Sequence, residues 1–179
     1  MRKALFVIAT VLAASMLLAT PASAQLKLPR VSQKSTLTQT IGLTDVTINY
    51  SRPGVKGRTI WGDLVPYDKV WRTGANEATH LATSKTIQLG EMTLAPGLYT
   101  LWTQHTRSGT SLIVNRQVGQ WGTVYNAAND IGRVPLELAN APEFVEDFTI
   151  TIRSLGQNRG AIDLAWGDKV ATANFMVRP

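Results

Sequence analysis

The sequence predicts an all-β protein, a single antiparallel β-sandwich or open barrel of about ten short strands. Stretches in which apolar and polar residues alternate recur at intervals of about 8 to 12 residues, separated by turns rich in Gly, Pro and Asn. No stretch after residue 24 has the apolar period of about 3.6 residues, with capping residues, that an amphipathic helix requires.

The N-terminal 24 residues have the features of a bacterial signal peptide. Arg2 and Lys3 form a charged start, residues 4–18 carry no charge, and residues 22–24 are small enough for a signal peptidase. The uncharged run is shorter than the roughly 20 residues that span a bilayer. We therefore expect a protein exported to the periplasm or beyond, with no membrane span in the mature chain.

The amino-acid composition limits the classes of function that this protein could have. The chain has no cysteine, so an apolar core must stabilise the exported protein without disulfides. Removal of Arg2 and Lys3 lowers the formal net charge from +6 to +4, and the basic residues after Arg72 are scattered singly. This spread argues against nucleic-acid binding, which needs a dense basic stripe. We expect an extended or disordered segment at 25–34 and one domain at 35–179.

The first strands are predicted at 35–41 and 44–50, joined at Gly42 into a hairpin. In the second of them Val46, Ile48 and Tyr50 share one face, which is the period-two pattern of a half-buried strand. A long irregular loop follows at 51–78. Short strands are expected next at 79–84 and 86–89.

A Pro-Gly turn at 96–97 precedes a predicted hairpin of strands 98–105 and 110–115. A second irregular loop, at 116–132, could fold over the first. The remaining strands are expected at 134–138, 144–153, 161–166 and 170–177, with a tight corner at 167–168. Trp102 and Trp166 lie within these strands and are expected in the core.

The loop at 51–78 is the candidate functional region, because long structured loops on β scaffolds often carry function. Arg52, Lys56 and Arg58 bring three cations together with no acid among them. Arginine offers paired hydrogen bonds to carboxylate, sulfate or phosphate, so these residues could bind an anion. Alternatively, they pair with Asp63, Asp68 or Glu77 and only brace the loop.

The second candidate string ends the same loop and contains Trp71, Arg72, Asn76 and Glu77. Asn76 and Glu77 could orient a hydroxyl-rich ligand beside Arg72, with Trp71 or Trp61 as an apolar wall. The structural alternative is a partly buried Arg72–Glu77 pair under Trp71.

Catalytic and metal signatures are weak. A hydrolase would use Glu77 with Asp63 or Asp68 as its second carboxylate. The two histidines, without cysteine, give no zinc-ligand spacing, and no serine stands in a nucleophile motif. The cation-rich loop lacks the spacing of a P-loop. We expect no cofactor.

Several strings together resemble a known family. They occupy residues 39–42, 50–58, 64–67, 70–79 and 95–100. They are similar to a domain-of-unknown-function family (number 2911) of exported bacterial proteins. The resemblance implies a single β-rich exported domain and implies no activity, ligand or catalytic residue.

The preferred hypothesis is a non-enzymatic exported β-sandwich that binds an anionic or hydroxyl-rich small molecule, such as an envelope saccharide, through the loop at 51–78. The hydrolase using Glu77 is the enzymatic alternative. A structural or assembly module of the envelope, acting through exposed strand edges, is the third.

Overall fold

The structure is a computed structural model that describes residues 28–178, so the expected signal peptide at 1–24 lies outside the described residues. Within these residues the chain forms ten strands and one short 3-10 helix, η1 (Ala127–Asn129). In chain order the strands are β1 (Gln33–Ile41), β2 (Thr44–Arg52), β3 (Val70–Trp71), β4 (Thr79–Thr83), β5 (Ile87–Leu89), β6 (Met92–Leu94), β7 (Gly97–Thr106), β8 (Gly109–Asn115), β9 (Asp130–Gly156) and β10 (Arg159–Val177).

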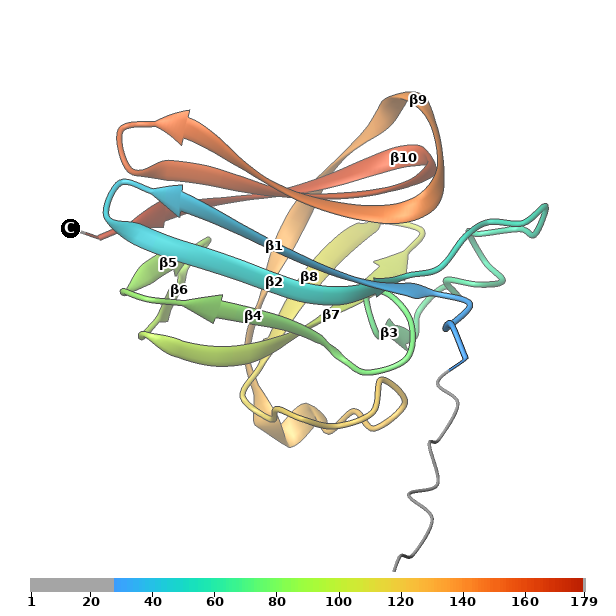
Figure 1. Ribbon diagram of the computed structural model, residues 1–179, viewed down its shortest axis with the longest axis horizontal. Coiled ribbons are helices and arrows are strands. Elements are labelled where there is room, and N and C mark those ends of the chain that lie inside the picture. Colours follow the sequence, from blue (N-terminus) through green and yellow to red (C-terminus); the bar gives the residue numbers. More distant parts are fainter. Residues whose placement is uncertain (1–27, 179) are drawn as a thin grey trace, which may run out of the picture.

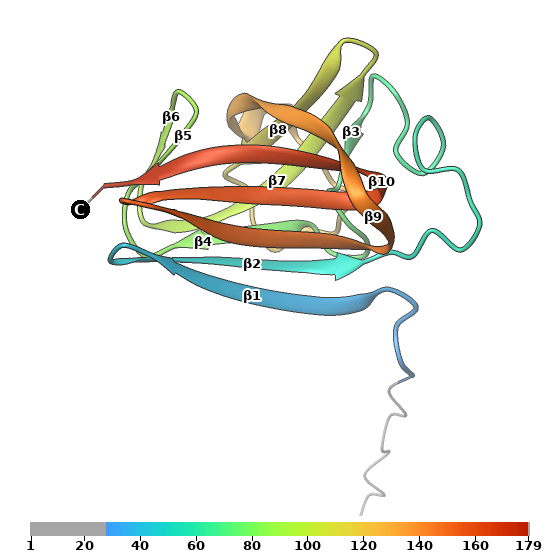
Figure 2. The same cartoon turned by 90° about the horizontal axis from the view of Figure 1, so that it is seen from above.

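The strands form one antiparallel sheet in the order β1-β2-β4-β7-β8-β9-β10-β5-β6, and β3 pairs with β7. The sheet folds over on itself like a sandwich without closing into a barrel, so β1 and β2 lie beside β9 and β10 (Figures 1 and 2). The all-β fold predicted from the sequence is confirmed.

Two strands are much longer than expected. β9 has 27 residues and β10 has 19, and each joins two segments for which separate strands were predicted. The first part of β9 pairs with β8 and the rest with β10, which carries the chain from one half of the sheet to the other. A break was predicted between the strands at 134–138 and 144–153, and a corner at 167–168. Both are instead parts of a β-bulge, where the pairing skips from Asn140–Lys169 to Val145–Gly167. Pro142 lies within the skipped part, where its missing N–H costs no ladder bond.

The core lies between the two halves of the folded sheet. The period-two residues Val46, Ile48 and Tyr50 of β2 are all buried, as predicted. Trp166 is buried in this core at 2% exposure, as predicted, whereas Trp102, at 1% exposure, is buried in a second, smaller cluster with Ala78 and Ile113, against Tyr125. The strand faces that carry the main core are therefore turned toward the opposite half of the sheet.

The two long loops meet near the end of the first one. Residues 53–78, apart from β3, are irregular, and the loop before η1 packs on them through backbone bonds from Ala78 N–H to Gln120 and from Gly122 N–H to Asn76. Gly122 is required there, because a Cβ atom would lie 2.6 Å from the Asn76 carbonyl oxygen. The second loop thus lies over the first. None of the helical structure in residues 28–178 is long and apolar enough to cross a membrane.

Candidate functional site

Arg52 braces the fold. Its side chain projects from the end of β2 toward β9, where Nε donates to the Phe148 carbonyl at 3.2 Å and Nη2 donates to Thr149 Oγ1 at 2.7 Å. These two donors are used within the protein. Arg52 is therefore part of the contact between the two halves of the sheet.

Other groups of the same stretch complete this contact, which we call the β2–β9 seam. The Tyr50 hydroxyl accepts a hydrogen bond from the Ile150 N–H at 2.9 Å, and the Phe148 N–H donates to the Pro53 carbonyl at 2.9 Å. On the edge of β9 that does not pair with β10, backbone groups therefore form hydrogen bonds with the Arg52 guanidinium, the Tyr50 hydroxyl and the Pro53 carbonyl. This explains how the sheet can fold over without forming a continuous ladder.

Arg58 and Lys56 do not converge on Arg52. The Arg58 guanidinium bends back on its own loop, donating from Nε to Val55 O at 3.0 Å and from Nη2 to Gly54 O at 2.6 Å. The Lys56 side chain is exposed. Within residues 28–178 neither residue forms an ion pair. The loop is braced by carbonyl groups rather than by the acids considered from the sequence.

Glu77 pairs with a residue outside the loop. Arg30 Nη1 donates to both carboxylate oxygens of Glu77, at 2.6 and 2.7 Å. This hydrogen bond is the main cause that lowers the pKa of Glu77. Asn76 Nδ2 likewise donates to Ser32 O at 3.2 Å. Together they fasten the segment before β1 to the loop, so the proposed Arg72–Glu77 pair does not form.

Trp71 belongs to an internal aromatic cluster. Its ring stacks on Trp166 with centroids 5.6 Å apart and meets Phe148 edge-on at 5.2 Å. Arg72 packs against Gly122, where its Cδ occupies the space that a Cβ would need. Neither side chain is among those that line the cavities described below.

The hydrolase arrangement has little geometric support. Asp63 and Asp68 are both exposed, and neither lines the small cavity of about 110 Å³ beside Glu77. The other polar side chains around that cavity are those of Lys34, Asn49, Ser51 and His80. Residues 28–178 contain no cluster of three His, Asp or Glu side chains that could hold a metal ion.

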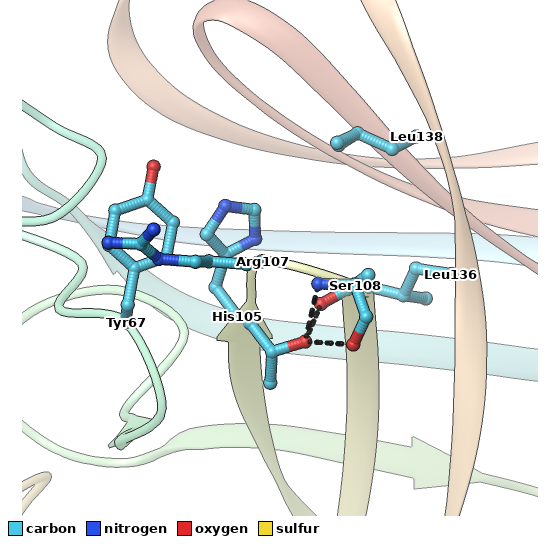
Figure 3. Close-up of a pocket in the computed structure, with 8 residues that line it drawn as sticks. Tyr67, His105, Arg107, Ser108, Leu136 and Leu138 are labelled. Atoms are coloured by element: carbon cyan, nitrogen blue, oxygen red, sulfur yellow. Dashed lines mark hydrogen bonds between the residues drawn. The ribbon is translucent and has the colours of Figure 1, made fainter.

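A larger cavity lies beside a different part of the loop. We call it the Tyr67 groove, an open space of about 720 Å³ between the loop, the β7–β8 turn and β9. Figure 3 shows Tyr67, His105 and Arg107 on one side of this space and Leu136 and Leu138 on the other. Tyr67 is 40% exposed and Leu138 is 45% exposed, so both polar and apolar surface is open to a ligand.

Three aromatic rings form a row at this groove. The His105 ring stacks on Tyr67 with centroids 5.2 Å apart, and the Trp61 ring, tilted by 41°, lies 5.0 Å from His105. The backbone supports the row, since the Asp68 N–H donates to the His105 carbonyl at 2.8 Å. The loop is thereby tied to β7, and its aromatic side chains are held in place.

The charges of the groove are simple. Burial lowers the pKa of His105, and its Nδ1 shares a hydrogen bond with Thr110 Oγ1, so the ring is neutral at neutral pH. Arg107 is exposed, and no acidic side chain within residues 28–178 pairs with it. The groove therefore offers one uncompensated cation beside a neutral aromatic surface.

Sequence reasoning found only part of this arrangement. Of the eight predicted site residues, Trp61 contributes to the aromatic row, whereas Arg52, Arg58, Asn76 and Glu77 form hydrogen bonds within the protein. The groove residues that the sequence did not single out are Tyr67, His105 and Arg107. Nothing local in the sequence links a loop tyrosine to a hairpin about forty residues away.

No curated protein and no solved structure matches the chain. One family model, described as a protein of unknown function (DUF2911), matches residues 32–175, which covers the sheet except for the last two residues of β10. The resemblance seen in the sequence is thus confirmed, and the protein belongs to the DUF2911 family.

Proposed function

We propose that the protein is an exported, non-enzymatic binding protein whose ligand is a small acidic, hydroxyl-rich molecule such as an acidic saccharide of the cell envelope. The ligand occupies the Tyr67 groove. The ligand class is the one suggested by the sequence. The proposed binding residues are Tyr67, His105 and Arg107 instead of Arg52 and Arg58. Export rests on the charged start, uncharged run and small residues of positions 1–24.

The observation that carries the proposal is the aromatic row beside an uncompensated Arg107. Aromatic faces present flat apolar surface to the C–H faces of a sugar ring, while a few polar groups fix its orientation. The Arg107 guanidinium can bind a carboxylate through two parallel hydrogen bonds. A shallow open groove with both features suits an acidic sugar better than a fully apolar ligand.

The absence of paired carboxylates in the groove supports binding over hydrolysis. Glycosidases place two carboxylates across the scissile bond, roughly 5 to 10 Å apart. No Asp or Glu is among the residues that line the Tyr67 groove in the described part of the chain. His105 is buried and held by Thr110, which suits a wall better than a proton carrier.

Calorimetric titration of the purified protein tests the proposal. The probes are galacturonic acid and glucuronic acid, with galactose and glucose as neutral counterparts and inorganic phosphate as a simple anion. We expect the acidic sugars to bind saturably, with the neutral sugars and phosphate at least tenfold weaker, because each lacks one of the two recognised features.

Two variants locate the site. Arg107→Gln should weaken the acidic sugars about tenfold or more, through loss of a charge-assisted pair. Arg116→Gln is the matched control, because Arg116 is also exposed but lies outside the groove. If none of the sugars binds, or if Arg107→Gln binds them as well as the control does, the proposal is wrong.

A further inference from the structure

A second cavity is lined by Trp61, whose ring contacts His105 of the Tyr67 groove. We call it the Phe144 cleft, an open space of about 380 Å³ lined by Arg58, Trp61, Phe144 and Asp168 over the buried side chains of Val55 and Ile60. Phe144 is 64% exposed, which is unusual for a phenylalanine beside a cavity. Its position on the bulged part of β9 turns its ring away from the core.

Trp61 connects the two spaces. It lines the Phe144 cleft, and its ring lies 5.0 Å from His105, which lines the Tyr67 groove. The indole Nε1 donates to Asp168 Oδ1 at 3.3 Å, which fixes the ring between the loop and β10. Contacting aromatic rings therefore link Trp61, in the wall of the Phe144 cleft, through His105 to Tyr67 in the groove.

The polar groups differ between the two spaces. The Tyr67 groove has the uncompensated Arg107. In the Phe144 cleft, hydrogen bonds chiefly from Lys169 hold the pKa of Asp168 below its ordinary value, so this carboxylate is ionised and accepts hydrogen bonds. Arg58 uses Nε and Nη2 within its loop, and its Nη1 has no partner in residues 28–178. This cleft offers both an acceptor and a donor to hydroxyl groups.

We propose that the two spaces are adjacent subsites for a single acidic oligosaccharide of at least two units. An acidic unit occupies the Tyr67 groove beside Arg107. The next unit crosses Trp61 into the Phe144 cleft, where its hydroxyl groups meet Asp168 and Arg58 and its ring face meets Phe144. This inference rests on the proposed function and deepens it, because it assigns the ligand a chain length.

The dependence of affinity on the number of sugar units in the ligand tests this inference. The probes are oligogalacturonides of one to six units, titrated into the purified protein by calorimetry. Joining two binding units makes the second contact intramolecular, so the affinity should rise by about a hundredfold between one unit and the length that fills both subsites. Beyond that length the affinity should stay constant.

The variant Phe144→Ala should remove this gain while leaving the affinity for the single unit unchanged. Leu43→Ala is the control, since Leu43 is 75% exposed in the turn between β1 and β2, outside both spaces. Equal affinity for one unit and for all longer chains would overturn the inference and leave the single-unit site intact. A length gain that survives Phe144→Ala would also overturn it. Absence of binding at every length would overturn both this inference and the proposed function.

Discussion

The β2–β9 seam makes a quantitative prediction for Tyr50→Phe. This substitution removes one oxygen atom and keeps the buried ring, which packs edge-on against Phe148 with centroids 5.9 Å apart. The Ile150 N–H, which donates to that oxygen at 2.9 Å, loses its partner. Tyr50 and Ile150 are 4% and 2% exposed, so water does not replace the hydroxyl without opening the seam.

The magnitude follows from the unpaired donor. A buried N–H that loses its hydrogen bond costs about 1–3 kcal/mol. Natural domains unfold with a free energy of about 5–15 kcal/mol, so this loss is a substantial fraction of the total. For a domain of this size each kcal/mol moves the melting temperature by roughly 2–4 °C.

Urea denaturation followed by circular dichroism measures the change, with the slope of the transition checked for constancy. Tyr99→Phe is the control, because the Tyr99 hydroxyl donates to Ala95 O at an exposed site where water can take its place. The control should lose less than about 0.5 kcal/mol. A loss below about 0.5 kcal/mol in Tyr50→Phe itself would refute the role given to the hydroxyl in the seam.

Three further predictions concern charged groups. Arg52→Lys should lower the free energy of unfolding by about 1–2 kcal/mol in urea denaturation, because lysine cannot make both contacts to β9; unchanged stability would contradict the seam. Glu77→Gln should cost less than about 1 kcal/mol in the same assay, since the Arg30 pair is half-exposed, and a larger loss would show that this pair matters more than its exposure indicates. Burial acts to raise the pKa of Asp163, but the hydrogen bonds it accepts, chiefly from Arg153, outweigh burial and lower it. The ionised group therefore stabilises the fold above about pH 4, and this contribution is lost as the pH falls through the lowered pKa. Thermal melts at a series of pH values should show a shallower acid limb for Asp163→Asn, and an equally steep limb would contradict the assignment.

The strands were predictable because burial on one face of a sheet leaves a local signature. Val46, Ile48 and Tyr50 alternate with polar residues, and a pattern of this kind needs no knowledge of the partner strand. The continuity of β9 was not predictable. Pro142 and its neighbours resemble a loop in sequence, and only the pairing of both flanks with β10 keeps this stretch extended.

The roles of the candidate site residues were less predictable, because their partners are distant in the sequence. Glu77 meets Arg30, 47 residues away, although Arg72 stands closer in the chain. Arg52 meets the carbonyl of Phe148 on a strand 96 residues further on. A cluster of cations indicates where donors occur, but the acceptors that satisfy them depend on how the sheet folds over.

The seam also bears on how copies of this protein behave toward one another. Backbone groups at 148–150 of β9 form a row that would otherwise be free to pair with an incoming strand, which is the usual starting point of edge-to-edge aggregation. Tyr50, Arg52 and Pro53 occupy that row from within the same chain. We therefore expect the start of the stretch that resembles a binding loop in the sequence to limit self-association, so variants that open the seam should aggregate more readily than the unaltered protein.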